Sequence, residues 1–83
     1  MTKVTARVDV GFGNQLFIRG EGNGLSWERG QPLRCLESAA WVWSAASAGE
    51  ESVFKLLLND EIWCSGENVR IRPGGQVEIV PRF

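Results

Sequence analysis

Hydrophobic and polar residues alternate along much of this chain with the period of two that is typical of half-buried β-strands. Residues 4–10 (VTARVDV) alternate perfectly. Residues 15–19 (QLFIR) alternate again after a glycine-rich turn at 11–14. Two such segments joined by a turn predict antiparallel neighbours in one sheet.

Glycine, asparagine and proline separate the remaining apolar segments. Residues 20–32 (GEGNGLSWERGQP) are too rich in glycine for regular structure, so they predict a long loop that carries Trp27. A hairpin turn is expected at Asn59-Asp60. The remaining strands are expected at residues 33–36, 40–44, 53–58, 61–64, 69–72 and 76–80. About seven to eight short strands without a helical period predict an all-β fold, a small antiparallel β-sandwich of immunoglobulin-like type.

Length and composition favour a single domain. A chain of 83 residues buries only about 60 to 65% of its unfolded surface, which supports one small core. We therefore expect residues 1–83 to form one domain. No segment approaches the roughly 20 consecutive apolar residues of a membrane span, so a membrane is not an expected partner.

The charged residues exclude several classes of function. The formal net charge is −1 and the basic residues are scattered, so the chain lacks the basic surface that binds a phosphate backbone. Nucleic acid is therefore not an expected partner. The chain has no His, which removes the commonest general base and the commonest zinc ligand. We expect no metal site, no cofactor and no enzymatic activity.

Cys35 and Cys64 leave two alternatives open. They pair if the fold brings their Cα atoms within about 7 Å, or they remain two separate buried thiols, as a reducing compartment favours. The N-terminal residues lack the apolar core and cleavage site of a secretory signal. This absence favours a cytoplasmic location, although the same start also fits a domain cut from a longer protein.

The four tryptophans fall into two groups. Trp41 and Trp43 share one side of the segment 40–44, and their apolar surroundings predict core positions. Trp27 lies in the glycine-rich loop and Trp63 borders a polar segment, so both are candidates for ligand binding. A flat aromatic face beside polar groups suits a sugar, because the pyranose ring stacks on it while the hydroxyls form hydrogen bonds.

The order of these features resembles the starch-binding modules known as carbohydrate-binding module family 20, and equally the related glycogen-binding family 48. The segments that carry the resemblance are LFIRG, GLSWERGQPL, AWVW, AGEESVFKLLLND, EIWCSGEN and VEIVP, within residues 15–81. The resemblance implies a non-catalytic module that binds starch, glycogen or a maltooligosaccharide. It also implies that such a module can be attached to, or associated with, a glucan-active enzyme.

The resemblance further implies roles for individual residues. Trp27 and Trp63 would be the two stacking platforms of an α-glucan site. Lys55 and Asn68 would be their hydrogen-bonding partners to glucose hydroxyls. Lys55 would then point to the sheet face beside Trp63, while its two neighbours along the chain point inward. The alternative for Lys55 is a lysine that lies along a solvated face without binding anything.

An immunoglobulin-like protein-interaction module is the alternative to sugar binding. Such a module would use the exposed surface of Trp27 and Trp63, or an unpaired edge strand, to bind another chain. The chain also departs from the family. Leu25-Ser26 precede Trp27 where the family usually has Gly, and the loop from Gly20 to Leu25 is more glycine-rich than usual. The chain has no Tyr, so we expect a single site without the tyrosine-based second site of some family 20 modules. The residues alone leave open whether the chain binds a sugar or another protein.

Overall fold

The computed structural model describes residues 1–46 and 49–83, and this part of the chain contains nine β-strands and no helix. Nothing within these residues therefore forms a helix of the length and apolarity that crossing a membrane requires. The strands are β1 (Thr2–Ala6), β2 (Leu16–Glu21), β3 (Gln31–Pro32), β4 (Arg34–Glu37), β5 (Ala40–Ala45), β6 (Ser52–Leu58), β7 (Ile62–Trp63), β8 (Val69–Ile71) and β9 (Gln76–Ile79).

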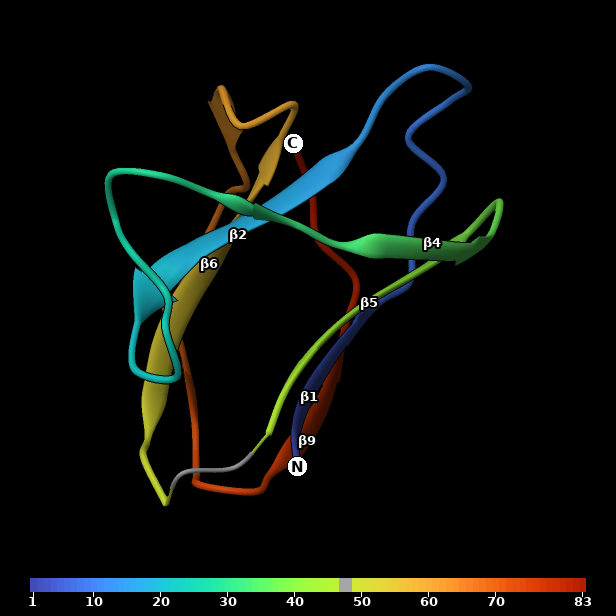
Figure 1. Cartoon of the computed structure of the whole chain (residues 1–83). Coiled ribbons are helices and arrows are strands. Elements are labelled where there is room, and N and C mark those ends of the chain that lie inside the picture. Colours follow the sequence, from blue (N-terminus) through green and yellow to red (C-terminus); the bar gives the residue numbers. More distant parts are fainter. Residues whose placement is uncertain (47–48) are drawn as a thin grey trace.

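The strands form the two layers of a sandwich (Figure 1). One sheet has the order β4-β5-β1-β9, and the other has the order β3-β2-β6-β7 with β8 also paired to β6. All strand pairs are antiparallel except β1 with β9, which is parallel. The predicted all-β sandwich is therefore confirmed, with one parallel pair that the alternation did not indicate.

The first two strands are not neighbours, so the prediction that they pair was wrong. β1 pairs with β5 and β9, whereas β2 pairs with β3 and β6 in the other sheet. The regular strand ends at Ala6, and the chain then crosses from one sheet to the other through Gly11 and Gly13, both at positive φ (84° and 89°). Val8 and Val10 leave the strand but still pack partly against the core.

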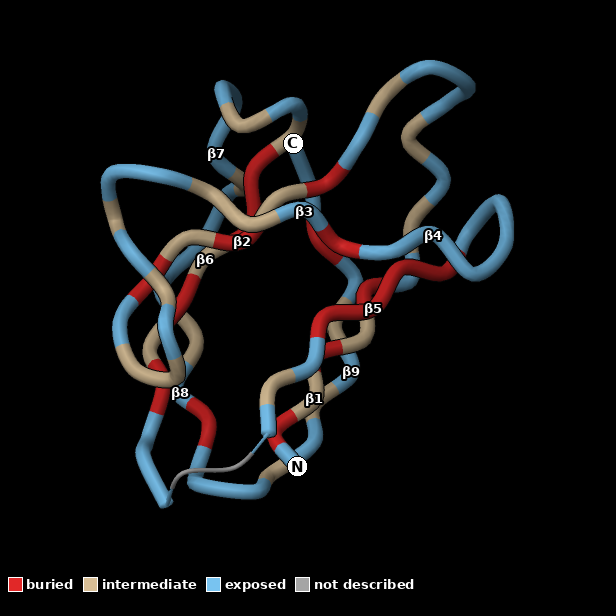
Figure 2. The backbone as a smooth tube through the Cα atoms, viewed as in Figure 1, coloured by how far each residue is buried: buried red, intermediate tan, exposed pale blue. Residues whose placement is uncertain are grey.

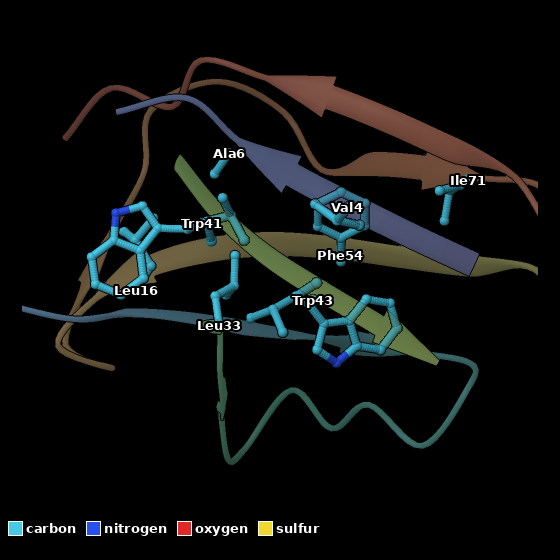
Figure 3. Close-up of a cluster of buried hydrophobic side chains, with 10 residues drawn as sticks. Val4, Ala6, Leu16, Leu33, Trp41, Trp43, Phe54 and Ile71 are labelled. Atoms are coloured by element: carbon cyan, nitrogen blue, oxygen red, sulfur yellow. The ribbon is translucent and has the colours of Figure 1, made fainter. Parts of the chain in front are cut away.

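The core lies between the two sheets, where the buried segments of both layers face each other (Figure 2). Trp41 and Trp43 of β5 are only 7% and 5% exposed, so their predicted core positions are confirmed. They lie opposite the smaller Ala6 and Val4 of β1. A large ring beside a small side chain allows close packing within the layer. Figure 3 shows both rings between the sheets, with Phe54 of β6.

The loop that carries Trp27 is shorter and better anchored than its glycine content predicted. Strand β2 continues to Glu21, and β3 pairs with β2 where irregular structure was expected. Within the loop, the Asn23 side chain donates to Ser52 Oγ at 2.6 Å and the Asn23 backbone N–H donates to Glu50 Oε1 at 2.7 Å. The loop is therefore tied to the start of β6.

The two cysteines do not pair. Cys35 lies in β4, at the edge of the four-stranded sheet, and Cys64 follows β7 in the other sheet. Both thiols are free, and Cys35 is exposed rather than buried. The sequence suggested two buried thiols as the alternative to a disulfide. The position of β4 as an edge strand, with all four of its residues exposed, explains why that alternative was wrong for Cys35.

Candidate binding site

Alternation along β6 places Lys55 on the outer face of the five-stranded sheet. Phe54 and Leu56 are fully buried in the core, so the side chain between them points away from it. The strand register places Arg19 of β2 directly opposite Lys55. Two cations therefore face each other across the strands, an arrangement that is unfavourable unless other groups compensate each charge.

The hairpin turn at Asn59-Asp60 brings Trp63 to this outer face. Both turn residues have positive φ (55° and 57°), as a type I′ turn requires, and the Glu61 N–H donates to the Leu58 carbonyl at 3.0 Å. The return strand then pairs Trp63 with Leu57 of β6, and Leu57 lies on the same face as Lys55. Trp63 keeps 44% of its surface exposed, so its ring is available to a ligand.

The tryptophan pair, which we define as Trp27 and Trp63, comes together on this face from two segments far apart in the sequence. The ring centroids lie 6.3 Å apart, and the ring planes are tilted by 32°. Trp27 is half-buried, because its loop folds back toward β2. The two aromatic candidates of the sequence thus form one surface, in which Trp63 is the more exposed ring.

Arg19 connects the tryptophan pair to the hairpin turn. Its guanidinium lies 5.5 Å from the centroid of the Trp63 ring, which is within the range of a cation–π contact. Its Nη1 donates to the Trp27 carbonyl at 3.3 Å, and its Nε donates to Asp60 Oδ1 at 2.8 Å. This last hydrogen bond is the main reason that the pKa of Asp60 lies below its ordinary value of 3.8.

The two predicted polar partners occupy different positions. Lys55 Nζ donates to the Gly66 carbonyl, so the lysine reaches over the loop that follows β7. Asn68 is exposed and immediately precedes β8, whose first residue pairs with Phe54. Continuing that register by one residue places Asn68 beside Lys55 at the sheet edge. Among the described residues, the Asn68 side chain forms no hydrogen bond.

Sequence reasoning missed Arg19 and Asp60. The alternation of β2 indicated that Arg19 points away from the core, but nothing local showed which strand would lie beside it. Asp60 was identified only as a turn residue. Strand β2 pairs with β6 so that Arg19 lies opposite Lys55, and the Arg19 side chain reaches Asp60 in the turn that follows β6. A charged residue on the outer face of a strand was the one available indication.

A hollow elsewhere on the molecule is separate from the tryptophan pair. It has a volume of about 480 Å³, and residues lining it include Asp9, Phe12, Asn14 and Trp41. Neither Trp27 nor Trp63 is among the residues that line it. In the part of the chain that the structure describes, no cluster of three or more His, Cys, Asp or Glu residues could hold a metal ion.

Comparison with known proteins finds a similar solved structure but no match by sequence. No protein-family model matches the chain, and no curated protein is similar enough in sequence to count as a match. Among solved structures, a glycoside hydrolase family 15 glucoamylase from Hypocrea jecorina is similar, with a TM-score of 0.78 and 19% sequence identity. The similarity covers 99% of this chain but only 17% of the glucoamylase chain. At this identity the likeness shows the fold alone.

Proposed function

We propose that this protein is a non-catalytic module that binds α-glucans, such as starch, glycogen or a maltooligosaccharide. Trp27 and Trp63 stack on the apolar faces of glucose units, while Lys55 and Asn68 form hydrogen bonds with their hydroxyls. The observation that carries the proposal is the meeting of two tryptophans, from a loop and a hairpin, on one exposed sheet face. The order of the sequence segments and the fold shared with a segment of a glucoamylase support it.

The geometry of the rings favours a curved glucan over a straight one. A sugar unit on Trp63 and another on Trp27 would lie at an angle to each other, because the ring planes are tilted by 32°. Successive units of an α-1,4-linked chain turn relative to one another, whereas a β-1,4-linked chain is extended and flat. The proposed site therefore selects maltooligosaccharides over cellooligosaccharides.

Lys55 and Asn68, the polar groups proposed to bind the sugar, can form hydrogen bonds with its hydroxyls. Lys55 has three N–H donors and gives one to the Gly66 carbonyl, which leaves two for a ligand. The exposed amide of Asn68 both donates and accepts. Such groups exchange hydrogen bonds with water for hydrogen bonds with hydroxyls, so they orient the sugar while the rings supply most of the affinity.

Catalysis is not part of this proposal. Glu61 and Glu67 flank Trp63, but both are exposed and solvated. Without His, the chain also offers none of the usual nucleophile and base pairs. An attached or associated glucan-active enzyme would supply any chemistry on the bound polysaccharide.

Migration in native gels that contain amylopectin or glycogen tests the proposal directly. We expect the wild-type protein to be retarded, and Trp63→Ala to migrate as it does in a gel without polysaccharide. Val80→Ala is the matched control, since Val80 is 67% exposed and follows β9 in the other sheet. Equal migration of the wild type with and without polysaccharide would contradict the proposal. If the protein is folded in that case, the result would favour the protein-interaction module.

Tryptophan fluorescence tests the predicted selectivity. Titration with maltoheptaose should change the emission, whereas cellohexaose should leave it unchanged. Because Trp41 and Trp43 are buried, the change should come from the tryptophan pair. It should shrink in Trp63→Phe and in Trp27→Phe, and disappear when both are substituted. A response that survives both substitutions would place the ligand elsewhere on the molecule.

A further inference from the structure

Arg19 is the point at which the loop of Trp27 and the hairpin of Trp63 are joined. It donates to the Trp27 carbonyl, lies against the ring of Trp63, and forms two hydrogen bonds with Asp60, one to the carboxylate at 2.8 Å and one to the carbonyl at 3.1 Å. The planar guanidinium can serve all these partners at once because its donors point in fixed directions. No single neighbour accounts for its position.

Asp60 extends the connection to the far end of the Trp27 loop. Its Oδ2 accepts a hydrogen bond from the Gly30 backbone N–H at 3.3 Å. A Cβ atom at Gly30 would lie 2.2 Å from Asp60 Oδ1 and 2.9 Å from Phe17 Cβ, so only glycine allows the carboxylate to approach. The Asp60 carboxylate therefore binds Arg19 of β2 and also the backbone of Gly30, where the Trp27 loop ends.

The burial of this ion pair distinguishes it from the other ion pairs of the described residues. The side chains of Arg19 and Asp60 are 19% and 26% exposed. By contrast, those of Arg7 and Glu78, which form a pair of the same length on the other sheet, are 50% and 60% exposed. Partial removal from water strengthens a charge-assisted hydrogen bond and restricts the geometry of both side chains. The Arg19–Asp60 pair is thus suited to fixing its neighbours in place.

We propose that Arg19, held by Asp60, is a positioning residue that sets the separation and tilt of the Trp27 and Trp63 rings before any ligand arrives. The value of this device for glucan binding rests on the proposed function, because a preformed pair of rings spares the ligand the cost of ordering them. Lys55, directly opposite Arg19, remains free of the Asp60 carboxylate and available to the ligand.

Circular dichroism without ligand tests the positioning role independently of sugar binding. Two indole rings with centroids 6.3 Å apart and non-parallel planes couple electronically and give a paired positive and negative band. Trp27→Phe or Trp63→Phe identifies the contribution of this pair. We expect Arg19→Met to lose most of that contribution, and Arg7→Met, which breaks the exposed ion pair, to retain it. An unchanged band pair in Arg19→Met would overturn the inference.

A second variant covers the case in which Arg19→Met fails to fold. Asp60→Asn keeps an acceptor for the Gly30 N–H but removes the charge that holds Arg19. We expect its band pair to be weaker than that of the wild type at neutral pH. If Asp60→Asn keeps the full band pair, the carboxylate does not position the rings and the inference fails.

Affinity measurements connect the positioning role to binding. Maltoheptaose affinity should fall by about tenfold in Arg19→Met, the size of effect that loss of one anchoring contact commonly has, and should stay unchanged in Arg7→Met. If the wild type does not bind maltoheptaose, the proposed function fails, while the dichroism still decides whether Arg19 positions the rings. A weakened band pair with full affinity would show that ring order does not serve binding.

Discussion

The two pairs of tryptophans in this protein illustrate two different ways of placing a large ring. Trp41 and Trp43 lie two residues apart on β5, so strand alternation alone puts them on the same side of their sheet, the side that faces the other sheet. Trp27 and Trp63 come from a loop and a hairpin, and they meet only because β2 and β6 pair. The first pair fills the core, and the second forms a surface whose arrangement depends on an ion pair.

The hydrogen bonds of the indole N–H groups sharpen this contrast. Trp43 Nε1 donates to Gln31 Oε1 at 2.9 Å, whereas the buried Trp41 Nε1 has no acceptor among the described residues. Gln31 also donates to the Gly24 carbonyl in the Trp27 loop at 2.9 Å. One side chain therefore links a core ring to the loop that presents a surface ring.

The largest difference between the pairs should appear in stability. Trp41→Ala should lower the free energy of unfolding by about 3 to 5 kcal/mol, because it leaves a cavity in the core. Trp63→Ala should cost about 1 to 2 kcal/mol, since nearly half of that ring is already in water. Urea denaturation measures both values. If Trp63→Ala unfolds the domain, its ring belongs to the core and the proposed site is misplaced.

Substitution of Gln31 should have the next largest effect on the free energy of unfolding. Gln31→Met removes the acceptor of the buried Trp43 N–H and should cost about 1 to 2 kcal/mol. Gln31→Glu is the control, because it keeps an acceptor for Trp43 but cannot donate to the Gly24 carbonyl. Equal stability of the two variants in urea at pH 7 would show that the loop contact, and not the core indole, accounts for the loss.

Acid should lower the stability of the fold by protonating Asp60, which holds Arg19 beside the tryptophan pair. Because the pKa of Asp60 is lower in the folded state than its ordinary value of 3.8, the ionised carboxylate stabilises the fold fully above that value. The stabilisation is lost as the pH falls below it toward the folded pKa. Asp60→Asn should be less stable than the wild type by about 1 kcal/mol at pH 7, and the difference should shrink toward zero in acid. A difference that is constant from neutral pH to pH about 2 would contradict this.

Lys55 should show the smallest effect on stability. Lys55→Met should change the free energy of unfolding by less than about 0.5 kcal/mol, because the side chain lies on the outer face of the sheet. Retardation by amylopectin should nevertheless decrease, since the ligand loses hydrogen-bond donors. Lys3→Met is the matched control, as Lys3 is also half-buried but lies in β1 of the other sheet. Normal retardation of Lys55→Met would leave Lys55 as a solvated lysine without a role in binding.

The candidate site was predictable from the sequence only in part. Trp63 could be placed beside the strand of Lys55, because the Asn59-Asp60 turn fixes the hairpin within a few residues. Trp27 was recognised as a candidate, but its contact with Trp63 depends on where its loop returns. The role of Arg19 could not be seen, because its partners lie on segments separated from it by long stretches of chain.

The sequence by itself determined most of the segments that form strands and most of the side chains that face the core, because side-chain direction in a strand alternates with the chain's own geometry. It also determined that Trp41 and Trp43 are core residues. Only the tertiary structure decided that β1 and β2 lie in different sheets, that Cys35 is exposed, and that Trp27 meets Trp63. Strand pairing depends on which apolar faces bury each other most completely across the whole domain, and alternation within one segment carries no information about its partner.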